Sequence, residues 1–520
     1  MTIVQQVRPV TGLLLPRRSF STWTLKKRDF SLFAASKETP KNSRPYSFYF
    51  ADWVDNDKAQ DTLGSQMIRT LSSQTESTTP IDSEPVRPFR ILFLGTPEVA
   101  AETLQTLHEA SRQSLLEEDT ATPKLPPFEI AGVVTQPPRP RNKRSKKLVQ
   151  SPVGQLALDL DLPLLTPQKA NSKRFLDQLA ELPKEEDGDD ESATTATNNN
   201  NNNSTDVDIY PHGLAPIDLC ITAAYGQYLP KRFLATPALG TVNIHPSLLP
   251  KWRGASPVQR SLQAGDNPIG VTVLYTVSAM DAGPIIAQEE YTLDDENDEE
   301  ETKSATFLLP TLFQKGTQLL LEKLSDILAG KITMDTAQAQ TEDDATAATL
   351  IHSTEGQLRP WDETAEQCIY KYRGFSMWPQ TYMYIQVVAN DDDSNDDGDD
   401  DDTELPVIKV KITQARVLRN DNGTLVKQEP TQTLQMGPNK KNDGLRVTCF
   451  DGSVLEVLKV QPAGRPKPFA ARDLQNGYPK ATLQWHVQDD MATLDHVPAG
   501  TEKRKRKKST KPQPTTTVAQ

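Results

Sequence analysis

The chain has 520 residues, of which 36% are hydrophobic and 40 are prolines, which excludes one compact core filling its whole length. Its formal net charge is −13, but three segments without Lys or Arg hold 23 acidic residues, which leaves +10 for the remainder. The three cysteines, Cys220, Cys368 and Cys449, are far apart and odd in number. This argues against a disulfide framework or a cysteine metal site and predicts buried, reduced thiols. No apolar run reaches the roughly 18–20 residues of a membrane span, so we expect no membrane partner.

The N-terminal segment differs from the rest of the chain. It is basic, rich in Ser and Thr, and has no acidic residue before Asp29. This composition is typical of an organellar transit peptide. We predict a transit peptide and disordered extension over residues 1–87, with the mitochondrion as destination and the plastid as the alternative. A basic extension without a targeting role is the competing interpretation.

Ordered patterns begin at residue 88. The apolar run 89–95 ends in Gly and is followed by helical spacing over 96–110, which predicts a strand, a tight turn and a helix. Residues 128–137 predict the next strand. The segment 151–165 predicts a helix that leads into a short strand.

The middle of the chain continues this alternation. The near-continuous apolar run 217–226 is typical of a buried strand in a parallel sheet, and 240–246 predicts its neighbour. Residues 255–265 predict a helix, with Ser256 as N-cap and Gly265 just after its end.

Two strands and a long helix complete the first pattern. The strands are expected at 269–277 and 285–293, and an amphipathic helix at 311–330. Alternating strands and helices predict an α/β fold with a mostly parallel, Rossmann-like sheet over residues 88–332.

A second pattern follows a Thr- and Ala-rich linker predicted at 333–349. It combines a short helix at 364–375 with several β-rich runs, one of which turns at an Asp-Gly pair. We therefore predict a small, OB-like β-barrel domain over 350–490. A basic disordered tail is expected at 491–520.

Three low-complexity segments interrupt these patterns. Residues 185–205 are acidic and then Asn-rich, and residues 293–302 and 390–404 are acidic. Such segments carry too little apolar surface to offset the entropy of ordering them. We predict that all three are disordered insertions.

Polar side chains stand at the end of one predicted strand. Asn243 and His245 are two residues apart, so they face the same way on a strand, and Asp281 follows the next strand. Ligands bind beyond the carboxyl ends of strands in open α/β sheets, and neighbouring strand ends would bring the three residues together. An amide, an imidazole and a carboxylate suit acyl transfer to an amine, since they can stabilise an oxyanion and carry protons.

No nucleophile accompanies this set. Ser247 lacks the G-x-S-x-G elbow, so direct transfer is preferred to a covalent intermediate. The alternative for His245 is a structural histidine with satisfied hydrogen bonds, and the residues alone leave the two interpretations about equal.

The stretch "NIHPSLLPKWRGASPVQRSLQAGD", followed by "GVTVLYTVSAMDAGPII", resembles the folate-dependent formyltransferases. The resemblance implies that Asn243, His245 and Asp281 are catalytic. It also implies that the S-L-L-P element helps to bind 10-formyltetrahydrofolate, and the absence of metal-ligand spacing leads us to expect no metal. That element consists of Ser247, Leu248, Leu249 and Pro250.

Other features resemble the methionyl-tRNA formyltransferases within that superfamily. They are "FLGTPEVAAETLQTL", "VVTQPPRPRNKRSKKLVQSPV", "MWPQTY" and "LKVQPAGRPKPFAARDL". The resemblance implies formyl transfer to the α-amine of methionyl-initiator tRNA, which yields formylmethionyl-tRNA for organellar translation initiation. Residues 139–147 hold six Lys or Arg, and the resemblance implies that Arg144, Lys146 and Lys147 bind the tRNA acceptor end. We expect a monomer.

Three alternatives remain open. A charge run such as 139–147 is often only a solvated face. A folate-dependent formyltransferase could instead use a small amine, such as an amino sugar or a purine precursor. A non-catalytic RNA-binding protein could retain the fold, although the intact Asn243, His245 and Asp281 argue against this.

Overall fold

The structure is a computed structural model that describes residues 87–116, 125–141, 147–180, 214–293, 300–389, 406–439 and 443–488. The predicted transit peptide, the insertions at 185–205 and 390–404, and the basic tail lie outside the described residues, apart from Arg87.

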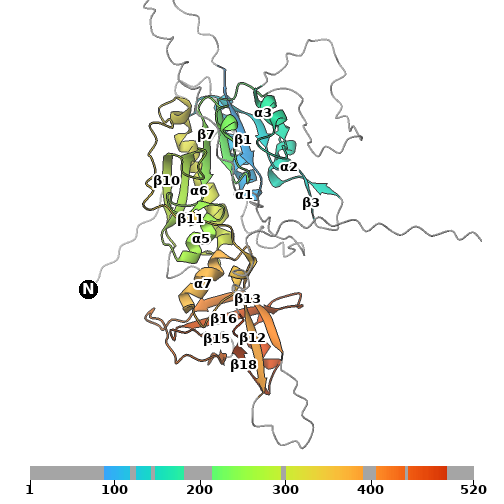
Figure 1. The fold of residues 1–520 in the computed structure, drawn as a ribbon, viewed down its shortest axis with the longest axis vertical. Coiled ribbons are helices and arrows are strands. Elements are labelled where there is room, and N and C mark those ends of the chain that lie inside the picture. The colour runs from blue at the N-terminus through green and yellow to red at the C-terminus, as the bar shows by residue number, and fades with distance from the viewer. Residues whose placement is uncertain are drawn as a thin grey trace, which may run out of the picture. The chain divides into compact units, whose positions relative to one another are not determined.

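A seven-stranded sheet organises the first half of the chain (Figure 1). Its strands, in spatial order, are β10 (Ile285–Tyr291), β9 (Ile269–Tyr275), β7 (Thr241–His245), β6 (Leu219–Ala223), β1 (Phe89–Gly95), β2 (Phe128–Val134) and β5 (Leu164–Leu165). The ladders from β7 to β5 are parallel, whereas β9 pairs antiparallel with both β7 and β10. The predicted mostly parallel, Rossmann-like sheet is confirmed.

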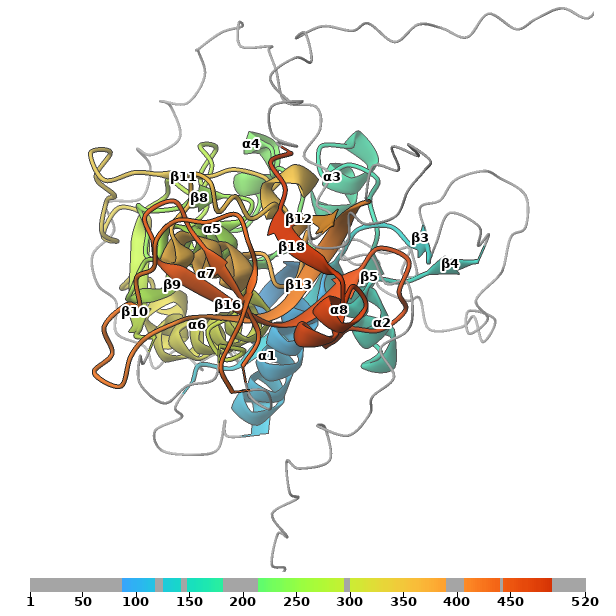
Figure 2. The same ribbon diagram turned by 90° about the horizontal axis from the view of Figure 1, so that it is seen from below.

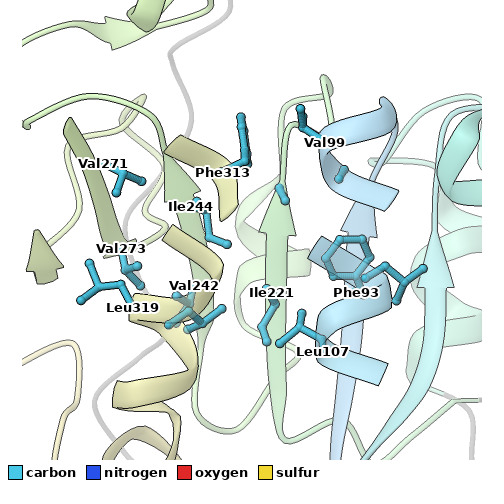
Figure 3. Packing of buried hydrophobic residues seen from close by; sticks show 14 of the residues in the cluster. Phe93, Val99, Leu107, Ile221, Val242, Ile244, Val271, Val273, Phe313 and Leu319 are labelled. Carbon is cyan, nitrogen blue, oxygen red and sulfur yellow. The ribbon is translucent and has the colours of Figure 1, made fainter. Parts of the chain in front are cut away.

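Helices cover both faces of this sheet. They are α1 (Glu98–Leu116), α2 (Pro152–Asp159), α3 (Lys173–Ala180), α4 (Lys231–Leu234), α5 (Pro257–Ala264) and α6 (Ala305–Leu328). On one face, Val242 and Ile244 of β7 belong to the same buried cluster as Phe313 and Leu319 of α6 (Figure 3). On the other face, a smaller cluster includes Phe233 of α4.

The start of α6 differs from the prediction. The amphipathic pattern predicts a start at residue 311, just after Pro310, and a proline inside a helix lacks an N–H and clashes with the preceding turn. The helix begins at Ala305 and contains Pro310. Ala305 and Leu308 are fully buried in the main core, and this burial offsets the hydrogen bond that Pro310 cannot make.

Two predicted irregular segments are partly ordered. In the predicted insertion at 293–302, the Leu293 amide donates to Asn267 Oδ1 at 2.9 Å, and the Glu301 carbonyl accepts from the Ser304 amide at 3.2 Å. Only residues 294–299 of that segment lie outside the description. The predicted linker at 333–349 is hydrogen-bonded to the first domain, because its strand β11 (Ala347–Ala348) pairs with β8 (Arg253–Gly254). The predicted disorder therefore does not extend to residues 293 and 300–302, and the predicted linker is bound to the first domain through β11.

The second half of the chain forms a curled antiparallel sheet (Figure 1). Its strands are β14 (Gln435–Met436), β15 (Leu445–Thr448), β16 (Val454–Pro462), β13 (Val407–Val417), β12 (Thr381–Ala389) and β18 (Ala481–Trp485), with β17 (Phe469–Ala470) on β16. The two edges meet, since the Leu434 amide donates to the Leu483 carbonyl at 2.8 Å and the Trp485 amide to the Gln432 carbonyl at 3.0 Å. The predicted barrel-like domain is confirmed.

Short helices accompany this sheet: η2 (Ser353–Gly356), α7 (Ala365–Gly374) and α8 (Arg472–Asn476). Thr364 caps α7 in a capping box with Gln367, which explains why the predicted helix starts there. The predicted burial of the cysteines is confirmed for all three, and none is in a disulfide. Burial raises the pKa of the Cys220 thiol, which favours the unreactive protonated form.

Candidate active site

Asn243 and His245 lie on the face of β7 that is turned away from α6. Val242 and Ile244, the alternate residues, fill the core between β7 and α6. Because side chains alternate across a strand, Asn243 and His245 point to the opposite face. His245 is 4% exposed, whereas Asn243 is half-buried. The predicted common orientation of the pair therefore follows from the packing of β7 against α6.

The amide of Asn243 is oriented by the neighbouring strand. Thr222 of β6 is its register partner, and the Thr222 hydroxyl donates to Asn243 Oδ1 at 2.7 Å. Among the described residues, no hydrogen-bond partner is found for Asn243 Nδ2. The contact therefore occupies the Asn243 oxygen and leaves its N–H donors available to a ligand. Sequence reasoning missed Thr222, although a hydroxyl residue in an otherwise apolar strand was a signal.

The His245 ring is held in one tautomer by a backbone carbonyl. Its Nε2 lies 2.9 Å from the Trp252 carbonyl oxygen. A carbonyl only accepts hydrogen bonds, so Nε2 carries the proton when the ring is neutral. The other nitrogen, Nδ1, lies 3.7 Å from Asp281 Oδ2. Nδ1 is therefore the nitrogen that can take up and release a proton beside a carboxylate.

Asp281 reaches the pair by a route that differs from the prediction. The expectation of neighbouring carboxyl strand ends was wrong, because β9 is antiparallel to β7 and its last residue, Tyr275, pairs with Val242 near the start of β7. The loop 276–284 instead brings Asp281 to His245. At Gly283 a Cβ atom would lie 1.7 Å from the Tyr275 carbonyl oxygen, so only glycine permits this close approach.

The Asp281 carboxylate is also fixed. Its Oδ2 accepts a hydrogen bond from the Gly254 amide at 2.9 Å, and its backbone has φ of 49°. Left-handed backbone is uncommon outside glycine and persists where surrounding contacts hold it. The structure thus brings together all three predicted catalytic residues.

The S-L-L-P element follows His245 and is bound firmly to the sheet. Ser247 Oγ donates to the Lys251 carbonyl at 2.8 Å, and Leu249 packs on Leu274 and Ile285. Ser247 and Leu249 are both buried, whereas Leu248 and Pro250 are half-buried. Within this element, the side chains of Leu248 and Pro250 remain available to a ligand.

A cavity of about 290 Å³ adjoins the same element. Ser247 and Leu248 line it together with Trp252, Asp266 and Gly270, among others. None of the three predicted catalytic residues lines it. A formyl group bound in this cavity would therefore not meet Asn243, His245 or Asp281.

Two short strands, β3 (Arg139–Pro140) at the start of the basic segment and β4 (Leu148–Val149) just after it, pair as a ribbon that projects from the sheet (Figure 2). Arg144 and Lys146 lie outside the described residues, and Lys147 is exposed next to β4. The ribbon is a separate two-stranded sheet, whereas Asn243 and His245 lie on β7 and Asp281 follows β9, so Lys147 and the predicted catalytic residues come from different parts of the domain.

The base of the ribbon is tied to the loop after β6. Gln136 Nε2 donates to the Tyr225 carbonyl at 3.2 Å, and Arg139 Nη2 donates to Gln136 Oε1 at 2.8 Å. Since β6 is the neighbour of β7, this contact holds the start of the ribbon at the catalytic half of the sheet.

The described residues offer neither a metal site nor a membrane span. They contain no group of three or more His, Cys, Asp or Glu that could hold a metal ion. No helix among them is both long and apolar enough to cross a bilayer.

Comparison with known proteins agrees with this arrangement. Residues 90–308 match the formyl transferase family, and residues 351–479 match the formyl transferase C-terminal domain family. A methionyl-tRNA formyltransferase of Bacillus subtilis (strain 168) is 32% identical over 293 residues, which cover 56% of this chain and 74% of the relative. One of Enterococcus faecalis is 29% identical over 380 residues, covering 72% and 92%.

A solved sugar N-formyltransferase from Shewanella sp. is 15% identical and has a TM-score of 0.35, with coverage of 55% of this chain and 88% of that one. This likeness is too weak to bear on the substrate. The matched families and the identity to the bacterial enzymes, extending over both halves of the chain, are decisive: the chain belongs to the methionyl-tRNA formyltransferase family.

Proposed function

We propose that this protein transfers the formyl group of 10-formyltetrahydrofolate to the α-amine of methionyl-initiator tRNA. The observation that carries the proposal is the convergence of Asn243, His245 and Asp281 at one site, in a chain that belongs to the methionyl-tRNA formyltransferase family. The product, formylmethionyl-tRNA, serves translation initiation.

The donor set fits an N-formyl group. Such a group presents one carbonyl oxygen, which becomes negative when an amine attacks the carbon, and one nitrogen that must gain a proton on leaving. Asn243 offers an N–H donor whose orientation Thr222 fixes. His245 Nδ1 and the Asp281 carboxylate offer a proton acceptor pair 3.7 Å apart. Each requirement of the reaction therefore has a side chain at the site.

Asn243 stabilises the charge that develops on the formyl oxygen. Its amide donates to that oxygen from a position set before the reaction, so no reorganisation is needed as the charge forms. The electrostatic gain is largest where water is scarce, and Asn243 is half-buried on a covered strand. This predicts an effect on turnover rather than on substrate affinity.

His245 and Asp281 handle the proton. The attacking amine loses one proton as its bond to the formyl carbon forms, and the leaving nitrogen gains one as its bond to that carbon breaks. Asp281 attracts the positive charge of a protonated His245, while the Trp252 carbonyl keeps Nδ1 turned toward the carboxylate. The pair can thus hold the proton between the two events.

The S-L-L-P element supports the folate donor in this proposal. Thr272 and Gln288 hydrogen-bond its backbone: the Leu249 amide donates to Thr272 Oγ1 at 3.2 Å, and Gln288 Nε2 donates to the Leu249 carbonyl at 2.8 Å. The element is therefore rigid, and Leu248 and Pro250 give it an apolar surface next to His245. A rigid wall of this kind aligns a donor at little entropic cost.

The basic ribbon binds the acceptor end of the tRNA in this proposal. Six Lys or Arg in residues 139–147 supply phosphate contacts. Gln136 holds the base of the ribbon to the loop after β6, which keeps the tRNA end near the catalytic half of the sheet. Phosphate contacts give affinity, whereas selection of the initiator needs contacts to exposed bases or to shape.

We also propose a mitochondrial location, on the composition of the first 28 residues. A fluorescent fusion of residues 1–87 should be imported into mitochondria, and the same fusion with its Arg and Lys residues replaced should stay outside. Import into plastids instead would support the alternative destination.

The function is tested by a panel of acceptors. With 10-formyltetrahydrofolate as donor, methionyl-initiator tRNA should be formylated far faster than free methionine, an amino sugar nucleotide or a glycinamide ribonucleotide. Uncharged tRNA supplies the blank. Preferential formylation of the amino sugar nucleotide or of the glycinamide ribonucleotide would overturn the proposal in favour of a small-molecule enzyme. No formyl transfer to any acceptor would favour an RNA-binding protein.

A further inference from the structure

The segment between the two domains contacts the catalytic residues through a second set of hydrogen bonds. Residues 340–348, here called the strap, have the polar sequence "QTEDDATAA" and run beside the loop that carries Asp281. Nothing in this sequence carries apolar periodicity, and it contains no residue of the proposed triad. Its contacts to the surroundings of the catalytic residues are made by Gln340, Thr346 and the backbone, and Glu342 forms an ion pair with Arg253 at 3.0 Å.

Gln340 holds the Asp281 loop. Its Nε2 donates to the Asp281 carbonyl at 2.8 Å and to the Gly283 carbonyl at 2.7 Å. Its Oε1 accepts from Arg253 Nε at 3.0 Å, which fixes the amide so that its N–H groups face the loop. One side chain therefore bonds both sides of the turn in which Asp281 has left-handed backbone.

Thr346 holds the residue that orients His245. The Trp252 amide donates to Thr346 Oγ1 at 2.9 Å, and Trp252 has φ of 64°, a left-handed conformation that favours glycine. The carbonyl of the same Trp252 accepts from His245 Nε2 at 2.9 Å. Trp252 therefore links the strap to the His245 imidazole through two hydrogen bonds.

The end of the strap holds the amide that binds the catalytic carboxylate. Ala348 in β11 pairs with Gly254 in β8, and the Gly254 amide donates to Asp281 Oδ2 at 2.9 Å. A Cβ atom at Gly254 would lie 2.7 Å from the Ala348 carbonyl oxygen, so the pairing depends on glycine. The strap therefore contacts the surroundings of Asp281 from both sides.

We propose that the strap is a positioning element of the reaction centre, which acts through Asp281 and His245 and touches no reacting atom. The inference rests on the proposed function, because it assumes that Asp281 takes part in formyl transfer. Two left-handed residues, Trp252 and Asp281, set the triad geometry, and both are held by strap contacts. Without the strap contacts, Asp281 and Trp252 can relax to commoner backbone conformations. The imidazole would then lose the fixed position of the Trp252 carbonyl.

The test compares two identical substitutions two residues apart. Gln340→Leu removes the two donors to the loop, whereas Gln338→Leu alters an exposed side chain outside the strap. Gln340→Leu should lower kcat for methionyl-tRNA by about 10- to 100-fold, as small displacements of catalytic groups do, with KM for tRNA and folate within about twofold. Gln338→Leu should retain the wild-type kcat. Equal kcat for the two variants would overturn the proposal.

A double-mutant cycle identifies the residue through which the strap acts. In an Asp281→Asn background, Gln340→Leu should cost little further activity in single-turnover assays, because the group that it positions is already disabled. Fully multiplicative losses would overturn action through Asp281. Undiminished activity of Asp281→Asn itself would overturn the catalytic assignment of Asp281, which is a failure of the proposed function rather than of the strap alone.

A second variant guards against a loss of folding. Thr346→Val removes the acceptor for the Trp252 amide at an exposed position while keeping a β-branched side chain. It should lower kcat and leave the melting temperature within a few degrees, and Thr346→Ser should restore the activity. If both Thr346 variants have wild-type kcat, Thr346 has no positioning role. A proportional loss of kcat and of melting temperature in all strap variants would reduce the strap to a structural element.

Discussion

The Thr222 hydroxyl donates a hydrogen bond of 2.7 Å to Asn243 Oδ1 across the parallel ladder between β6 and β7. The bond occupies the oxygen of the amide and leaves its N–H groups for the site. A side chain of the neighbouring strand thereby decides which end of the Asn243 amide is available to a ligand. Thr222 is 5% exposed, so water cannot replace its hydroxyl if that group is removed.

Thr222→Val should therefore lower kcat by about 10-fold with little change in either KM, because Asn243 can rotate or flip and lose its preset donor. Thr222→Ser keeps the hydroxyl and should restore most of the activity. Steady-state assays of the two variants, with melting temperatures as a check on folding, make the comparison. Equal activity of Thr222→Val and the wild type would mean that Asn243 needs no such orientation.

Replacement of Arg144, Lys146 and Lys147 by Ala should weaken tRNA binding while leaving folate binding unchanged. Each lost phosphate contact should also reduce the salt dependence of tRNA affinity by roughly 0.7–0.9 log units per log unit of salt. Titrations at several salt concentrations measure both quantities. Because a planar guanidinium can stack on an unpaired base or bond it at two points, Arg144→Lys should also impair the choice of initiator over elongator tRNA.

The control for this prediction is a charge-matched variant elsewhere on the first domain. Arg112, Lys173 and Lys331 are exposed and lie on or next to the helices α1, α3 and α6, none of which belongs to the ribbon. Their replacement by Ala changes the net charge by the same amount and should affect tRNA affinity much less. Equal losses in the two triple variants would reduce the ribbon to a solvated charged surface.

Asp218 should make stability depend on pH. Burial of its carboxylate opposes ionisation, but hydrogen bonds from Arg87 and from the Arg90 amide outweigh burial and hold the pKa of Asp218 below its ordinary value. The stabilisation is present above the ordinary aspartate pKa of about 3.9 and is lost as pH falls through the lower pKa of the folded state. Asp218→Asn should therefore lower the free energy of unfolding by about 1–2 kcal/mol at neutral pH.

Urea unfolding at pH 7 and at pH 3 or below checks this sign. The difference between wild type and Asp218→Asn should shrink at the lower pH. Asp421 is exposed, and Asp421→Asn serves as the control. Its free energy of unfolding should differ little from that of the wild type at either pH. A constant difference at both values would mean that the Arg87–Asp218 pair does not govern the effect.

The core of the first domain was predictable because its strands are short apolar runs bounded by Gly and Pro. Such runs report burial directly, and β1, β6, β7 and β9 lie within the predicted ranges. The start of α6 was not predictable from local rules. The rule that proline ends a helix was overridden by the burial of Ala305 and Leu308, which only tertiary packing determines.

The proximity of Asn243, His245 and Asp281 was expected from the sequence, but the geometry that brings them together was not. Asn243 and His245 followed from the alternation of side chains on a strand. The antiparallel direction of β9 leaves no mark in the sequence, so the route by which Asp281 reaches His245 was missed. The strap was taken for a linker because Gln340 and Thr346 act through single hydrogen bonds to backbone groups, which no periodicity reports.

The most direct test of the reaction centre is the single-turnover rate of formyl transfer from 10-formyltetrahydrofolate to methionyl-initiator tRNA in Asn243→Ala, His245→Ala and Asp281→Ala. Each rate should fall about 100-fold or more, as expected for loss of an oxyanion donor or a proton-handling group. Folding should survive, because the melting temperature depends mainly on the core around Val242 and Ile244. Near-wild-type rates in all three folded variants would contradict the assignment of the reaction to these residues.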